Sequence, residues 1–176
     1  SITDSKYQMI YKQSGQTLKI QFCEKSMKFP SFGINSTVSK DLVITVPAGW
    51  ICDSLDIDAG AADVIIRDMT IAELDFDGAS GLFDLENCSV TDLDVDAASD
   101  NVTFSGTLET LDFDGASADC KLNLTNCPRQ ISMEGASGNL DITLPSSVSK
   151  TALISVQGKT LDSNASVHVT PSPFRL

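Results

Sequence analysis

Residues 73–78 have the sequence ELDFDG, in which acidic and apolar side chains alternate before a glycine. This arrangement resembles the start of a calcium-binding loop, because Ca²⁺ prefers oxygen ligands such as carboxylates. A calcium loop between two helices also needs a bidentate Glu at its twelfth position. That position is Asp84 when counted from Glu73, and Thr103 when counted from Asp92. The sequence does not fit this type of calcium site, so the alternation needs another explanation.

The alternating segment recurs along the chain. Similar segments begin at Leu55, Leu74, Leu93, Leu111 and Ile131, at intervals of 18 to 20 residues. Each is followed by a turn of small residues and then by a second alternating run. Successive side chains of a strand point to opposite faces, so each repeat predicts two half-buried strands. Repeats of this length are typical of one coil of a β-solenoid.

We therefore predict an all-β fold, a single-stranded β-helix or β-solenoid of about five coils of 18–20 residues, right-handed by analogy. β caps are expected at both ends, because open terminal strands invite association. The prediction is one domain over residues 1–176, with an N-terminal cap and leading strand at 1–50, regular repeats at 51–144 and a C-terminal cap at 145–176. The expected cap strands are YQMIY, TLKIQF and LVITV within residues 7–46, and TALISV and SVHVT within residues 151–170.

Stacking the coils brings the apolar side of every strand into four inward files. The files are Leu55, Leu74, Leu93, Leu111, Ile131; Ile57, Phe76, Val95, Phe113, Met133; Val64, Phe83, Val102, Cys120, Leu140; and Ile66, Leu85, Phe104, Leu122, Ile142. Burying each large apolar side chain contributes roughly 1.5–3 kcal/mol. One coil alone cannot bury these side chains, but its neighbours above and below can.

The polar side of the first strand in each repeat forms two outward columns of acids. The columns are Asp56, Asp75, Asp94, Asp112, and Asp58, Asp77, Asp96, Asp114, Glu134. Carboxylates about 5 Å apart repel each other by roughly 0.5–1 kcal/mol per pair in water. One interpretation is a row of weak sites for Ca²⁺ or another cation, or a surface for a basic partner. The alternative is a solvated acidic face in which the second Asp of each strand caps the small-residue turn.

The charge distribution excludes two classes of partner. The formal net charge is −12, and residues 41–144 alone carry −18. Such a surface repels the phosphates of nucleic acids and anionic lipids. No apolar run approaches the roughly 18 residues that a membrane-spanning helix needs. We therefore expect no nucleic-acid partner and no membrane insertion by this segment.

Catalytic patterns are missing from the sequence. His168 is the only histidine, so a catalytic triad with a second histidine cannot form. The five cysteines contain no C-x-x-C pair, and the three bases among residues 51–144 share no column. The sequence predicts a protein that is not an enzyme, with no catalytic residue, no cofactor-binding residue and no dedicated metal site. The acids of the two columns are weak cation candidates only.

The order of the motifs resembles the bacterial DUF4097 family of adhesin-like β-solenoids. The resemblance rests on DLVITVPAG at 41–49, SLDIDAGAADVII at 54–66, the LDFDGASG repeats and LDITLP at 140–145. It implies a cell-envelope domain that is extracytoplasmic and tethered by a segment absent from this chain. The implied function is non-enzymatic binding or scaffolding, as an adhesin, with an envelope or cell-surface ligand that is a protein or a glycan. The family offers no catalytic motif to transfer.

Two other functions are compatible with the repeats. The first is a polymer-forming structural solenoid in the manner of bactofilin filaments, so the chain is expected either as a monomer or in end-to-end association. The second is a carbohydrate-active enzyme, which would need a deep groove with paired carboxylates and a base.

Overall fold

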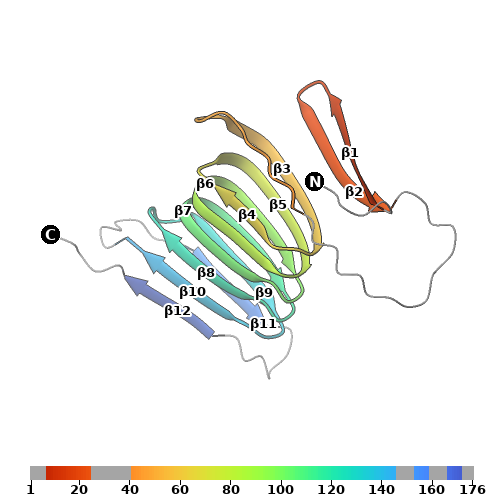
Figure 1. Ribbon diagram of the computed structural model, residues 1–176. Helices are drawn as coiled ribbons and strands as arrows, with labels where there is room; N and C mark the ends of the chain where they lie inside the picture. Colours follow the sequence, from red (N-terminus) through yellow and green to blue (C-terminus); the bar gives the residue numbers. More distant parts are fainter. Residues whose placement is uncertain (1–6, 25–40, 146–152, 159–165, 172–176) are drawn as a thin grey trace, which may run out of the picture. The chain divides into compact units, whose positions relative to one another are not determined.

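The computed structural model describes residues 7–24, 41–145, 153–158 and 166–171 (Figure 1). The chain divides into two compact units, residues 1–46 and residues 47–176. The described residues are all-β, and they include no helix that is long and apolar enough to cross a membrane. The single domain expected over the whole chain stays a prediction.

The first unit contains a β-hairpin. Strands β1 (Tyr7–Ser14) and β2 (Thr17–Glu24) pair antiparallel, with Ser14 opposite Thr17. The two-residue turn begins at Gly15, whose φ of 60° suits a tight hairpin turn. YQMIY and TLKIQF are thus confirmed as strands.

The prediction of a strand at LVITV, residues 42–46, is wrong. Residues 41–46 form no strand, and the side chains of Leu42, Val43 and Ile44 are 54%, 84% and 58% exposed. An apolar, β-branched sequence forms a strand only where another strand accepts its backbone hydrogen bonds, and here no such pairing forms. The N-terminal cap stays a prediction.

The second unit is a parallel β-solenoid of about five turns, as predicted (Figure 1). Its strands are β3 (Ile51–Ala61), β4 (Val64–Arg67), β5 (Thr70–Ser80), β6 (Leu82–Ala97), β7 (Asn101–Gly115), β8 (Asp119–Leu124), β9 (Gln130–Gly135) and β10 (Asn139–Leu144). One side of the coil is formed by β3, β5, the second halves of β6 and β7, and β9. The other side is formed by β4, the first halves of β6 and β7, β8 and β10.

The two expected C-terminal cap strands continue the register of the coils. Strand β11 (Leu153–Gly158) pairs parallel with β9, and β12 (Ser166–Pro171) pairs parallel with β10. Ile154 lies opposite Ile131, and Val167 lies opposite Leu140. These strands therefore repeat the pairing of the regular coils. Their role as a cap and the hand of the coil stay predictions.

The small-residue corner requires glycine in the second and fifth coils. Gly81 and Gly138 have φ values of 148° and 144°. A Cβ at Gly81 would lie 2.4 Å from the carbonyl oxygen of Ala62, and one at Gly138 would lie 2.1 Å from that of Ala118. Consecutive coils approach too closely at this corner for any side chain at these two positions.

The opposite corner is built by Asp68 and Asn87, which have left-handed φ values of 56° and 55°. Asp and Asn adopt this conformation more readily than other non-glycine residues. The Asn87 side-chain amide donates a hydrogen bond of 2.7 Å to Asp68 Oδ1 in the coil before it. The strand β6 runs through this corner, with a register shift between Leu85 and Cys88.

The four predicted inward files form the core. Their members are buried in every coil from the second onward, whereas Leu55, Ile57 and Val64 of the first coil are half-buried. The rings of Phe76 and Phe83 stack across the core with centroids 3.9 Å apart. A further inward file on the corner side was not predicted from the sequence. Its members are Cys52, Ile71, Val90 and Leu108.

Ring size and corner size are matched along one inward file. Phe113 is followed two residues later by Gly115, whereas Val95 is followed by Ala97 at the equivalent position. A Cβ at Gly115 would lie 2.6 Å from Phe113 Cε1. A large ring therefore leaves room only for glycine at the following corner.

Candidate functional site

The structure brings all the predicted acids together on one side of the coil. Each Asp of the first column lies opposite the next in register, from Asp56 on β3 to Asp112 on β7. The second column runs likewise from Asp58 to Glu134 on β9. The Asp side chains of both columns are exposed, and Glu134 is half-buried. Each column has a spacing of about 4.8 Å, the distance between neighbouring strands.

The register results from the apolar residues between the acids. Leu74, Leu93 and Leu111 lie opposite one another and are no more than 2% exposed. A shift by one residue would place these leucines in water and the acids in the core. The buried leucines therefore fix the positions of the carboxylates outside.

A third column on the same side was missed in the sequence analysis. Its members are Ser54, Glu73, Asp92, Thr110 and Gln130, which lie opposite one another in register. Each one immediately precedes the leucine or isoleucine of the first inward file. That constant position in the repeat is the signal that would have identified the column. We call the three outward columns together the acidic face.

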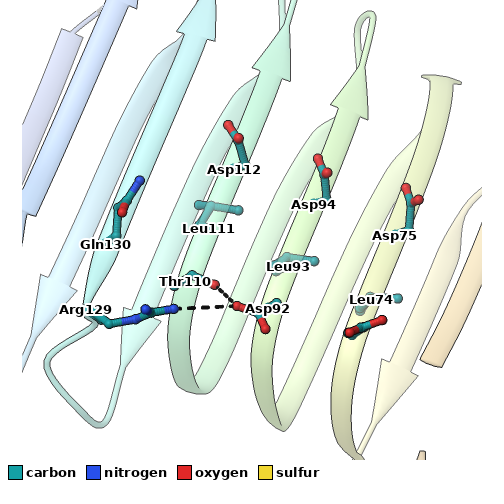
Figure 2. A pocket seen from close by; sticks show the side chains of 11 residues that line it. Leu74, Asp75, Asp92, Leu93, Asp94, Thr110, Leu111, Asp112, Arg129 and Gln130 are labelled. Carbon is teal, nitrogen blue, oxygen red and sulfur yellow. Dashed lines mark hydrogen bonds and ion pairs between the residues drawn. The ribbon is translucent and has the colours of Figure 1, made fainter. Parts of the chain in front are cut away.

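The acidic face contains an open groove of about 390 Å³ (Figure 2). The buried leucines of the first inward file lie at its base, and five acids line it: Glu73, Asp75, Asp92, Asp94 and Asp112. In Figure 2, Asp75, Asp94 and Asp112 project in one row from neighbouring strands. The remaining polar lining comes from Thr110, Arg129 and Gln130.

Asp92 is the acid with compensating partners in this groove. Thr110 donates a hydrogen bond from its hydroxyl group to Asp92 Oδ1. Arg129 Nη2 lies 3.9 Å from the same oxygen, and both side chains are more than half exposed. An exposed ion pair at this distance contributes little to stability. Arg129 therefore places a positive charge beside Asp92.

Asp94, in contrast to Asp92, is surrounded by other carboxylates. The pKa of its carboxyl group is raised, first by partial burial and then by the charges of Asp112, Asp75 and Asp96. A like charge on a neighbouring strand disfavours the ionised form. The in-register stacking therefore makes Asp94 easier to protonate than an isolated aspartate.

The cation candidates are close together but do not form a dedicated metal centre. Among the described residues, no group of three or more His, Cys, Asp or Glu side chains is arranged to hold a metal ion. The strand spacing of about 4.8 Å is twice a Ca²⁺–oxygen distance of about 2.4 Å. A Ca²⁺ between two adjacent acids of one column would thus receive two protein ligands and fill its other positions with water. Such a site would be weak, and cation binding stays a prediction.

The only histidine lies away from the acidic face in register. His168 of β12 pairs with Asp141 of β10, on the other side of the coil. The described residues that line the groove include no histidine, cysteine or lysine. The groove offers carboxylates, one guanidinium and two neutral polar groups, a set suited to binding cations or basic groups.

Comparison with protein families places the repeats in a known family. A family model described as Toastrack DUF4097 matches residues 1–107 and residues 52–173, which overlap as expected for a repeated structure. No curated protein and no solved structure matches the chain.

Proposed function

The chain belongs to the Toastrack DUF4097 family, and on this basis we propose that it acts as a non-enzymatic binding or scaffolding domain of the bacterial cell envelope. The family consists of β-solenoid structural or surface domains and is generally extracytoplasmic in bacteria. It is not typically enzymatic. An adhesive role, tethering by a segment outside this chain, and a protein or glycan ligand are parts of the proposal.

The in-register stacking of like charges on the acidic face is the observation that carries the proposal. The first two columns contain no basic residue between β3 and β9. Each adjacent pair of carboxylates costs roughly 0.5–1 kcal/mol in water, and less in salt. A partner that brings positive charge across several coils relieves this repulsion, and the field of the columns accelerates its association. The favoured ligand is a Lys- or Arg-rich segment of another envelope protein.

Binding of a fluorescent oligolysine peptide tests this proposal. We expect affinity that falls with added salt and is lost in the triple variant Asp75→Asn, Asp94→Asn, Asp112→Asn. The matched control removes as many charges from the other side of the coil, through Asp84→Asn, Asp119→Asn and Asp141→Asn. Retained binding by the control supports the acidic face as the site. Equal losses in both variants would show that net charge alone attracts the peptide and would contradict the proposal.

A polymer-forming structural role is the second candidate, favoured by the first coil. Within the described part of the chain, β3 has β5 as its one sheet neighbour. Trp50, Ile51 and Ile65 of this coil are 45%, 63% and 46% exposed. The final coil of a second copy could extend the parallel sheet there. Sedimentation and electron microscopy distinguish the candidates: filaments at micromolar concentration that disappear in an Ile65→Lys variant favour the polymer, and a monodisperse species favours the binding domain.

A further inference from the structure

Asp100 is an ionisable residue that is buried in the interior of the solenoid. It lies in the small-residue corner between β6 and β7, and it is 0% exposed. Among the described residues it is the one buried residue with a polar or charged side chain. Both carboxyl oxygens lack a hydrogen-bond partner of normal geometry in the described structure. A buried carboxylate without a partner is far more costly than a buried neutral acid.

A carboxyl group at this position of the repeat occurs in this coil alone. The residues that immediately follow it and its equivalents pair in register: Leu82 with Asn101, and Asn101 with Asp119. The equivalent residues in the other coils are Ala62, Gly81, Ala118 and Gly138. The other coils thus place only alanine or glycine at this position of the corner.

The carboxyl group of Asp100 projects toward the corner of the preceding coil. A Cβ at Gly78 would lie 3.0 Å from Asp100 Oδ2 and 2.5 Å from Cε1 of Phe76. The glycine therefore leaves space that the carboxyl group occupies beside an aromatic ring. Neither the ring nor the glycine supplies a charge to balance an ionised carboxylate.

No titratable group of the adjoining strands faces Asp100. The acids of β5, β6, β7 and β8 that flank this corner in the sequence are all exposed; they are Asp77, Asp96, Asp114 and Asp119. Burial raises the pKa of the Asp100 carboxyl group, and the backbone N–H of Ser99 opposes this shift to a smaller extent. No neighbouring charge contributes to the shift.

We propose that Asp100 is folded as a neutral carboxylic acid, so that the third corner of the solenoid binds a proton on folding and loosens as the pH rises. The corner is held by backbone hydrogen bonds to the preceding coil. Ala98 N–H donates to Gly78 O at 3.0 Å, and Asn101 N–H donates to Gly81 O at 3.1 Å. Ionisation of Asp100 draws water toward the carboxylate and weakens these bonds. The device makes the stability of a surface domain respond to the acidity around it.

The sign of the pH dependence follows from proton linkage. The unfolded chain loses the Asp100 proton near the ordinary aspartate pKa of about 3.9. The folded chain keeps it to a higher pH, because the folded pKa is raised. Stability therefore falls as pH rises from the unfolded to the folded pKa, by up to about tenfold in the folding equilibrium constant per pH unit. Above the folded pKa the loss stays constant.

Urea unfolding of the full chain between pH 4 and pH 7.5 tests the proposal. The variants are Asp100→Asn, which keeps the shape of the side chain, and Asp100→Ala, which matches the equivalent Ala62 and Ala118. The control is Asp53→Asn, which removes the same charge from an exposed position of β3. We expect the folding equilibrium constant of the wild type and of the control to fall more steeply with pH than that of Asp100→Asn. The difference should reach up to about tenfold per pH unit.

Hydrogen exchange gives a local measure that does not depend on global unfolding. After correction for intrinsic exchange rates, protection of the Ala98 and Asn101 amides is expected to fall with pH in the wild type and to stay constant in Asp100→Asn. At pH 7, Asp100→Ala is expected to melt at a higher temperature than the wild type. The proposal would be overturned if the stability of the wild type and of Asp100→Asn changed with pH in parallel. It would also be overturned if protection of the Ala98 and Asn101 amides in Asp100→Asn fell with pH as it does in the wild type.

Discussion

The two sides of the coil share one core, but they differ in the charges that stack on their outer surfaces. On the acidic face, Asp follows Asp in register. On the other side, which we call the mixed face, the outward positions carry varied residues. One column consists of Ile65, Asp84, Thr103, Lys121 and Asp141. Beside it, Arg67 lies opposite Glu86, and Ser105, Asn123 and Thr143 lie opposite one another in the later coils.

On the mixed face, outward side chains of successive coils form ion pairs and hydrogen bonds with one another. Arg67 donates two hydrogen bonds to Glu86 in the following coil, from Nε at 2.8 Å and from Nη2 at 2.7 Å. Thr103 donates a hydrogen bond to Asp84 in the same way. The hydrogen bonds from Arg67 lower the pKa of Glu86, whereas burial and like charges raise the pKa of Asp94.

The difference indicates that parallel stacking does not itself impose like-charge columns. The same strands and the same register accommodate opposite charges and hydroxyl groups on the mixed face. The acidic face keeps mutually repelling carboxylates although the geometry permits compensation. This contrast supports a binding role for the acidic face, as proposed above.

The largest predicted effect tests whether the two faces share one core. Phe76 lies beneath the acidic face and Phe104 beneath the mixed face, and they are 0% and 1% exposed. Each Phe→Ala change is expected to lower the free energy of unfolding by about 3–5 kcal/mol. Urea unfolding followed by circular dichroism measures both. A small effect at one site and a large effect at the other would show that only one face covers a packed interior.

The second prediction tests whether the acidic face is held in place from inside. Gly115→Ala places a Cβ against Phe113 and is expected to cost about 1–3 kcal/mol of stability. The same change in a Phe113→Val background reproduces the Val95 and Ala97 arrangement of the preceding coil, so its cost should be smaller. A double-mutant cycle by urea unfolding measures the coupling. Equal costs in the two backgrounds would contradict the matching of ring and corner.

Much of this arrangement could be predicted from the sequence because the repeat specifies it. The period of 18 to 20 residues and the alternation of leucine with aspartate determine which residues stack and which face they occupy. The four inward files and both acid columns follow from that alignment alone. The third column could have been predicted too, because each member precedes the first residue of a repeat.

Other features depend on contacts that alternation does not encode. LVITV has the composition of a strand but forms none, because strand formation requires a pairing partner. The burial of Asp100 depends on the space above Gly78 in the preceding coil. The compensation of Asp92 depends on Arg129, which lies outside the alternating segments.

The third prediction uses the opposite electrostatics of the two faces. Asp94→Asn removes repulsion and is expected to raise stability at pH 7 by about 0.5–1 kcal/mol in low salt, and by less in physiological salt. Glu86→Gln removes a favourable pair and is expected to lower stability slightly. The lowered pKa of Glu86 gives stability that is present above the unfolded pKa and is lost as pH falls through the folded pKa. The raised pKa of Asp94 has the opposite effect, so acid relieves its repulsion.

Thermal unfolding at pH 7 and pH 4 measures both changes. Asp141→Asn on the mixed face is the matched control for the loss of one negative charge. If Asp94→Asn and Asp141→Asn shift the melting temperature equally, the columns add nothing beyond net charge.

The smallest predicted effect concerns calcium. With a dissociation constant of about 1 mM, 1 mM Ca²⁺ would stabilise the fold by about 0.4 kcal/mol. For a chain of this size that is a rise of about 1 °C in melting temperature. The rise should exceed that in NaCl of matched ionic strength and should disappear when Asp94 and Asp112 are both changed to Asn. An identical change in melting temperature in the two salts would show that the acidic face has no Ca²⁺ sites.

The carboxylates of the acidic face interact because the coils hold them in register. A ¹³C NMR titration of the Asp94 carboxyl group tests this most directly, in the wild type and in the Asp75→Asn, Asp112→Asn double variant. We expect a pKa above the usual aspartate range in the wild type, and a fall toward that range when both neighbours are neutral. An ordinary pKa in the wild type, or one that stays the same in the double variant, would contradict it.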